Sequence, residues 1–117
     1  MTVELPDTNL SAFLLFSLGR KKRLKVVGRS MLPLLKPGEE ILIDSYIYRK
    51  SSPQINDLVV TIHPYQPNIT IVKRIVSIEK DGKYFLLGDN QRESIDSRHW
   101  GSIERSKILA KVTNRFA

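Results

Sequence analysis

The apolar and polar positions of this chain alternate mostly with the two-residue period of β-strands. Turn sequences rich in Gly, Pro, Asn and Asp separate the apolar runs, and Asp81-Gly82 predicts a tight hairpin. The runs predict strands at residues 24–28, 40–46, 57–63, 69–80, 83–88 and 108–116. This number of short strands predicts a mainly β protein, a compact and partly closed barrel-like structure.

Helical signals are confined to the ends of the chain. The apolar segment Leu10–Leu18 is far shorter than the roughly 20 residues that cross a bilayer. Basic residues follow this segment rather than precede it, which is not the order of a secretory signal. We expect a short helix, either packing Phe13, Leu14 and Phe16 on the core or lying at a surface. A short helical turn is also expected near residues 103–107.

The chain of 117 residues fits one domain with a modest core. We divide it into an N-terminal apolar and basic arm, residues 1–23, and a core, residues 24–114. Cysteine is absent and the two histidines have no ligand spacing around them, so we expect no disulfide, metal or cofactor. We expect a soluble, cytoplasmic protein without a transmembrane segment.

The net charge of +7 is concentrated in "RKKRLK" at residues 20–25. Such a patch is typical of contact with nucleic acid or with an anionic lipid surface. No aromatic residues interleave with these charges, and aromatic residues for base stacking are sparse in the strands. We therefore favour a solvated arm and expect no nucleic acid, but a basic β domain that binds nucleic acid remains an alternative. Peripheral membrane contact through residues 10–23 also stays open.

A small hydroxyl residue, Ser30, stands at the head of the apolar stretch "SMLPLL". A nucleophilic serine needs a base. His63 and His99 have no motif around them, whereas a lysine can serve if burial makes it neutral. Lys73 and Arg74 lie in the apolar run "ITIVKRIV" on opposite faces, so the pattern does not decide which of them is buried. Only the lysine can give up its proton.

A third stretch, "LLGDNQRESIDSRHWG" at residues 86–101, is polar and rich in turn residues. Alone it is typical of a long turn whose Asp, Asn and Ser side chains bond to the backbone. Together the three stretches resemble the signal peptidase I family of Ser–Lys endopeptidases, over about residues 24–114. The matching positions are Ser30, Met31, Pro33, Leu35 and Gly38, then Lys73 and Arg74, then Gly88, Asp89, Asn90, Ser94, Asp96, Ser97, Arg98, Trp100 and Gly101.

The resemblance implies a role for each of these groups. Ser30 would be the nucleophile, and its backbone N–H would donate to the oxyanion. Lys73 would be the general base and Ser94 would orient its amine. Met31 and Pro33 would line a cleft in which the substrate lies as an extended strand. The structural residues of the polar loop would be Gly88, Asp89, Asn90 and Ser97, braced by an ion pair between Asp96 and Arg98.

The chain also departs from the family pattern. Gly28 stands where many members carry a serine whose hydroxyl completes the oxyanion hole. Only residues 74–87 separate Lys73 from Gly88, so the long insertion usual at this place is absent. We also expect no membrane-spanning N-terminus. These departures lead us to expect a minimal, soluble catalytic core.

Such a reduced form resembles a subgroup, the nickel-type superoxide dismutase maturation proteases. The similar stretches are "LKPGEEILID", "TIHPYQPN", "KRIVSIEKDGKYFLLGDN" and "ESIDSR". The resemblance implies that the partner is a nickel superoxide dismutase precursor, whose N-terminal leader is removed. Composition and spacing give no sign that this chain itself holds nickel.

Two other Ser–Lys proteases remain alternatives. One is a soluble signal-peptidase relative with a different substrate, and the other is a self-cleaving repressor-type domain. Self-cleavage needs an internal scissile bond on a flexible segment, and the N-terminal arm offers only Leu18-Gly19 and the basic run.

Overall fold

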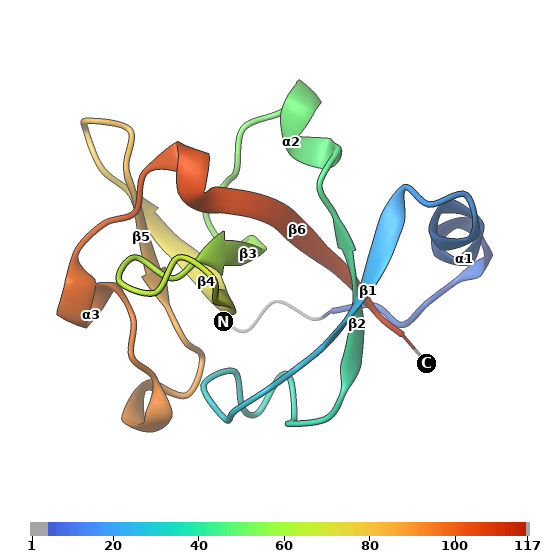
Figure 1. Ribbon diagram of the computed structural model, residues 1–117, viewed down its shortest axis with the longest axis horizontal. Coiled ribbons are helices and arrows are strands. Elements are labelled where there is room, and N and C mark those ends of the chain that lie inside the picture. Colours follow the sequence, from blue (N-terminus) through green and yellow to red (C-terminus); the bar gives the residue numbers. More distant parts are fainter. Residues whose placement is uncertain (1–4, 117) are drawn as a thin grey trace.

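The computed structural model of the chain describes residues 5–116. One antiparallel sheet dominates it, with the strand order β1-β2-β6-β3-β4-β5 (Figure 1). The strands are β1 (Lys21–Lys25), β2 (Glu40–Asp44), β3 (Leu58–Ile62), β4 (Thr70–Ile78), β5 (Tyr84–Leu87) and β6 (Ile108–Arg115). The expected mainly β fold is confirmed. β1 and β5 are the two edges, so the sheet is not closed.

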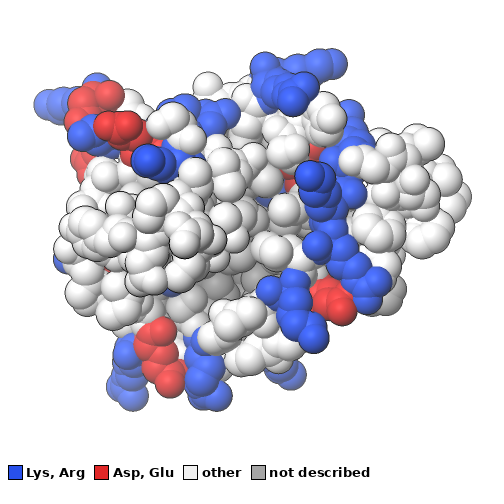
Figure 2. Space-filling model, viewed as in Figure 1, with Lys and Arg blue, Asp and Glu red and all other residues white. Residues whose placement is uncertain are grey.

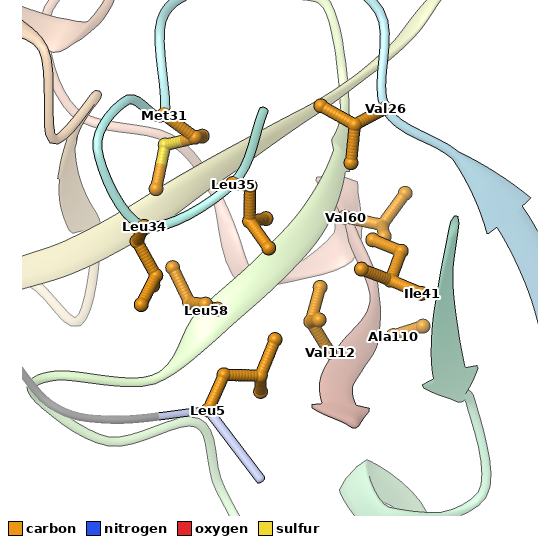
Figure 3. Packing of buried hydrophobic residues seen from close by; sticks show 10 residues of the cluster. All are labelled: Leu5, Val26, Met31, Leu34, Leu35, Ile41, Leu58, Val60, Ala110 and Val112. Atoms are coloured by element: carbon orange, nitrogen blue, oxygen red, sulfur yellow. The ribbon is translucent and has the colours of Figure 1, made fainter. Parts of the chain in front are cut away.

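The sheet curls, and the curling creates two apolar cores. Register shifts interrupt the pairings β2–β6, β3–β6 and β4–β5, and such bulges bend a strand and increase its twist. One core gathers around Leu35 and Ile41, which are fully buried (Figure 3). The other gathers around Val59, Ile75 and Leu86. Because β3 supplies side chains to both cores, it is the strand that joins them.

The predicted strands agree with the observed ones except the first. We expected residues 24–28, but β1 is Lys21–Lys25, opposite β2. Beyond β1 the backbone of Val26 still bonds to Glu39 and Gly38, and Gly28, with φ +82°, lies in the turn region that follows. An edge strand is exposed along its length, so the charged "KKR" needs no apolar alternation to pair with β2. The predicted hairpin at Asp81-Gly82 is confirmed, with Gly82 at φ +86° between β4 and β5.

The predicted N-terminal helix is α1 (Leu10–Ser17), and Asn9 caps it by accepting from the Ala12 N–H at 2.8 Å. Of its two expected placements, the surface one is observed. Phe13 and Leu14 are about half exposed, so the prediction that they pack in the core is wrong. The helix is attached through buried Ala12 and through Phe16, which contacts the ring of Phe116. No helix within residues 5–116 has the length and hydropathy to span a bilayer.

The remaining helical elements are single turns. The turn expected near residues 103–107 is η2 (Arg105–Lys107). The pattern did not predict α2 (Ile47–Lys50), η1 (Gln91–Glu93) or α3 (Ser97–Trp100). Two of these turns, η1 and α3, belong to the polar loop and help to shape the site.

Candidate active site

Ser30 and Lys73 lie on the wall of one cavity of about 380 Å³. One side of this cavity is the end of β1 with the segment that follows it, and the other is the beginning of β4. Its lining includes Met31, residues 24–27 and residues 69–72. Ser30 is partly exposed, whereas the Lys73 side chain is buried, with 3% of the residue exposed. The candidate nucleophile and the candidate base are more than forty positions apart in the sequence, and the fold brings both to this cavity.

Lys73 does not reach out to water as most strand lysines do. Its Nζ atom donates to Ser94 Oγ at 3.0 Å. Burial is the largest influence on the amine and lowers its pKa, which the positive charge of Arg98 lowers further. The negative charge of Asp96 acts in the opposite direction without reversing the shift. The net effect favours the neutral amine, the form that can accept a proton.

A chain of hydrogen bonds continues from Ser94 into the polar loop. Ser94 Oγ donates to Asp96 Oδ2 at 2.7 Å, and Arg98 Nε donates to Asp96 Oδ1 at 2.9 Å. Asp96 is fully buried, which by itself would raise its pKa. The hydrogen bonds from Arg98, from the Gly88 N–H and from Ser94 outweigh burial and lower the pKa of Asp96 to about 2. The expected ion pair between Asp96 and Arg98 is therefore present and ionised at neutral pH.

At Gly88 the polar loop packs closely against the segment that carries Ser30. A Cβ atom at this position would lie 2.3 Å from Ser94 Oγ and 2.6 Å from the Ser30 carbonyl oxygen. The next turn adds a bond, because the Asn90 N–H donates to the same Ser30 carbonyl at 2.8 Å. The side chain of Asn90 also donates to the Arg29 carbonyl, at 3.1 Å. The backbone of Ser30 is thus held by the loop that also holds Ser94.

Arg74, the second cation of the pair that alternation could not resolve, is buried as well. Its guanidinium donates twice to Asp89, at 2.8 and 2.9 Å, and once to the Asn56 carbonyl. The two neighbouring cations therefore differ in their partners. Arg74 has a carboxylate, while the hydrogen bond of the Lys73 amine within the described residues goes to a neutral hydroxyl. The loop residue Asp89 thus has a charge partner that the sequence did not reveal.

The end of the polar loop is fixed to the sheet by α3. Asp96 caps this turn by accepting from the Arg98 N–H, and Ser97 Oγ accepts from the Leu86 N–H of β5 at 2.9 Å. His99 accepts from the Asp96 N–H in the same turn. The other histidine, His63, packs against Trp100. Neither histidine lines the cavity that holds Ser30.

The remaining predicted positions are distributed unevenly. Met31 is buried beside the cavity. Pro33 is exposed and lines a neighbouring cavity of about 180 Å³, together with Arg74 and Asp89. Gly28, at φ +82°, has a left-handed backbone in which a serine would be strained. Among residues 5–116, no three His, Cys, Asp or Glu side chains are grouped so that they could hold a metal ion.

The sequence did not reveal that β4 has an open edge beside Lys73. Residues 70–74 pair with β3 on one side. On the other side, pairing with β5 begins only at Arg74. The strand edge of residues 70–73 therefore faces the cavity, which is lined by the same residues. Only the register between β4 and β5 shows this, and turn signals do not predict it.

Comparison with known proteins gives the class of this domain, a signal-peptidase-like one. The model of the family "Signal peptidase, peptidase S26" matches residues 9–81 and 79–117. The chain belongs to this family.

Relatives come from organelles and from bacteria. The mitochondrial ATP-independent inner membrane protease subunit 1b of Arabidopsis thaliana is 31% identical, over 73% of this chain and 63% of its own length. The mitochondrial inner membrane protease subunit 1 of Schizosaccharomyces pombe is 32% identical, over 75% and 68%. The probable signal peptidase I-1 of Synechocystis is 23% identical, over 74% and 66%. The chain thus spans less than two thirds of the length of several relatives that it matches.

Proposed function

We propose that this chain is a serine endopeptidase in which Ser30 is the nucleophile and Lys73 the general base. The observation that carries this proposal is the environment of Lys73. Its amine is buried, has a lowered pKa, contacts a neutral hydroxyl, and lies on the cavity wall that Ser30 also lines. Lowering the pKa of a buried lysine in this way makes it a better candidate for a general base.

The direction of the hydrogen bonds supports this assignment. Ser94 has one hydroxyl proton, which it donates to Asp96. Ser94 must therefore accept from the Lys73 amine rather than donate to it. A neutral amine that donates one N–H to Ser94 keeps its lone pair for another proton. Asp96 and Arg98 thus act on Lys73 through Ser94, by orienting its lone pair.

The proposed reaction has two stages, formation of an acyl-enzyme and its hydrolysis. In each stage Lys73 takes up one proton and then returns it. Lys73 takes the proton of Ser30 Oγ as that oxygen attacks the scissile carbonyl, and returns it to the departing amine. Lys73 next takes a proton from a water molecule that attacks the acyl-enzyme ester. It returns this proton to Ser30 Oγ as the ester bond breaks and the new carboxylate leaves.

The oxyanion would be stabilised by the backbone N–H of Ser30. The Ser30 carbonyl is used by Asn90, but its N–H has no protein partner among the described residues. One donor of this kind is worth about 3 kcal/mol in the transition state. Gly28 offers no hydroxyl as a second donor, which favours a slow enzyme with few substrates.

The substrate would lie in the cavity as an added strand. The open edge of β4 at residues 70–73 offers unpaired backbone groups that end beside Lys73. An extended peptide hydrogen-bonded to this edge would bring a carbonyl to Ser30. Met31 and the apolar side chains of residues 24–27 and 69–72 would receive its side chains.

The substrate that the sequence resemblance favours is the leader of a nickel superoxide dismutase precursor. The test is incubation of the purified chain with this precursor, followed by mass measurement of the products. We expect one cut that releases the leader, and no cut with Ser30→Ala. If the precursor stays intact while short peptides are cleaved, the substrate is wrong and a more general signal-peptidase-like role follows. The cytoplasmic location stays a prediction.

A further inference from the structure

The proposed oxyanion donor, the N–H of Ser30, belongs to the same peptide group as the carbonyl of Arg29. This peptide group is trans. In a trans peptide the C=O and the N–H lie in one plane and point in opposite directions. Any contact that fixes the direction of the Arg29 carbonyl therefore also fixes the direction of the Ser30 N–H.

Two groups donate to the Arg29 carbonyl. One is the Leu32 N–H at 3.2 Å, which belongs to the same turn and moves with it. The other is Asn90 Nδ2 at 3.1 Å, which comes from the polar loop. The backbone N–H of Asn90 also donates to the Ser30 carbonyl, at 2.8 Å. Asn90 thus holds both peptide groups that flank the candidate nucleophile.

The side-chain amide of Asn90 is itself held in place. Its Nδ2 atom donates to Glu93 Oε2 at 2.9 Å, and the same oxygen accepts from Arg29 Nε at 3.0 Å. Both partners of Nδ2 are acceptors, so the NH₂ group and not the amide oxygen faces them. Figure 2 shows acidic and basic residues side by side at the lower edge of the view, where the orange turn η1 lies in Figure 1.

We infer that Asn90 is a positioning residue that directs the Ser30 N–H toward the oxyanion. Its donation to the Arg29 carbonyl fixes the peptide plane, and it also polarises the amide, which makes the N–H a stronger donor. The direction of this N–H is important here because Gly28 supplies no hydroxyl as a second donor. The inference rests on the proposed function, since it concerns the oxyanion formed when Ser30 attacks.

The experiment compares cleavage of a leader peptide ester and of its thionoester by wild type, Asn90→Ala and Asn90→Asp. We expect kcat for the ester to fall on the order of tenfold with KM unchanged. Loss of a whole oxyanion donor costs about a hundred- to a thousandfold, but here the N–H remains and Leu32 still holds the carbonyl. Asn90→Asp keeps the shape of the side chain but cannot donate, so its rate should be no higher than that of Asn90→Ala.

The thionoester separates the aim of the N–H from a general loosening of the loop. Sulfur is a weak hydrogen-bond acceptor, so wild type should prefer the ester. This preference should shrink by about tenfold in both Asn90 variants. The matched control is Gln91→Ala, an exposed neighbour in η1 whose loss leaves the bond to the Arg29 carbonyl in place. It should keep the wild-type rate and the wild-type preference.

Two further measurements complete the test. The pH at half-maximal rate should stay that of wild type, because Lys73 is untouched. Glu93→Ala should slow the ester reaction less than Asn90→Ala, and the double variant should be no slower than Asn90→Ala, since Glu93 acts through that amide.

An unchanged ester preference in the Asn90 variants, equal losses in Gln91→Ala, or a shifted pH midpoint would each overturn the inference while leaving the proposed function intact. Failure of the proposed function is distinguishable, because Ser30→Ala would then cleave the ester as fast as wild type.

Discussion

The Nζ atom of Lys73 lies 3.0 Å from Ser94 Oγ, and that hydroxyl donates its own proton to Asp96. This relationship gives the amine a fixed donor direction without placing a negative charge in contact with it. A carboxylate in direct contact would hold the lysine protonated. The intervening hydroxyl lets burial dominate, so that the pKa of Lys73 falls although Asp96 is close.

The first prediction concerns the proposed pair of Ser30 and Lys73. Ser30→Ala and Lys73→Met should each reduce precursor cleavage by on the order of ten-thousandfold or more, because they remove the nucleophile and the base. The double variant should be no slower than either single one, since the two residues act as a unit. Lys73→Arg should not restore activity, because a guanidinium stays protonated. Single-turnover cleavage rates measure this, and a Lys73→Met protein with most of its activity would exclude lysine as the base.

The second prediction concerns pH. Because burial lowers the pKa of Lys73 in the folded protein, the cleavage rate should rise with pH through that lowered pKa. The unfolded chain binds the proton more tightly than the folded one. Stability should therefore increase with pH between the lowered pKa and the ordinary lysine pKa of 10.5.

Lys73→Met is the control for this pH dependence. It should remove the increase in unfolding free energy, which urea titrations at several pH values would measure. Ser94→Ala should keep the rise of the rate with pH but lower its plateau by up to about a hundredfold, because the amine loses its orientation. Unfolding free energies that vary with pH in the same way for wild type and Lys73→Met would refute a shifted lysine.

A third prediction concerns Asp96. Replacing it with Asn removes a buried charge that Arg98, Ser94 and the Gly88 N–H all contact. We expect a loss of about 2–4 kcal/mol of unfolding free energy at neutral pH. The wild type should lose part of this stability as pH falls from 3.8 through about 2, where Asp96 becomes protonated. Glu93→Gln, which removes an exposed ion pair with Arg29, is the matched control and should change stability little.

The sequence predicted the features that depend on interactions between residues close together in the chain. Two-residue periodicity is local, so it located the strands from β2 to β6. It misplaced β1, because the charged residues Lys21–Arg23 show no apolar alternation at an exposed edge. Ser30, Lys73 and Ser94 were assigned through the order of the motifs. In the structure Ser30 and Lys73 line one cavity, and Lys73 is hydrogen-bonded to Ser94.

Other features depend on contacts between distant parts of the chain. The strand pattern could not choose between Lys73 and Arg74, because the choice depends on Asp89 and Ser94 in a remote loop. Pro33 was assigned to the cleft from the motif alone, but the turn after Ser30 carries it to a neighbouring cavity. The open edge of β4 likewise arises from a register that no local pattern contains.

A fourth prediction tests how tightly the polar loop holds the Ser30 segment. Gly88→Ala would place a methyl group 2.3 Å from Ser94 Oγ and 2.6 Å from the Ser30 carbonyl. Relief of these contacts must move both residues, so we expect at least a hundredfold lower cleavage rate, since small misplacements cost about this much. Gly19→Ala is the control, because a Cβ there meets nothing and its positive φ costs only about 1 kcal/mol. Equal rates for the two variants would show that the Gly88 contact does not position Ser30.

The fifth prediction concerns the open edge of β4, where the substrate is proposed to add a strand. Among residues 5–116, residues 70–73 pair only with β3, so their outward N–H and C=O groups are free to bond with a peptide. Along such a pairing, every second residue of the peptide directs its backbone groups to the edge. N-methylation of a leader peptide, one residue at a time, should therefore impair cleavage at alternating positions before the scissile bond. Each sensitive position should lose about five- to tenfold in kcat/KM, as expected for one hydrogen bond. Matched peptides with alanine in place of each residue separate this effect from side-chain recognition by Met31 and the apolar lining. A uniform response to N-methylation along the leader would mean that the peptide does not bind as a strand on β4.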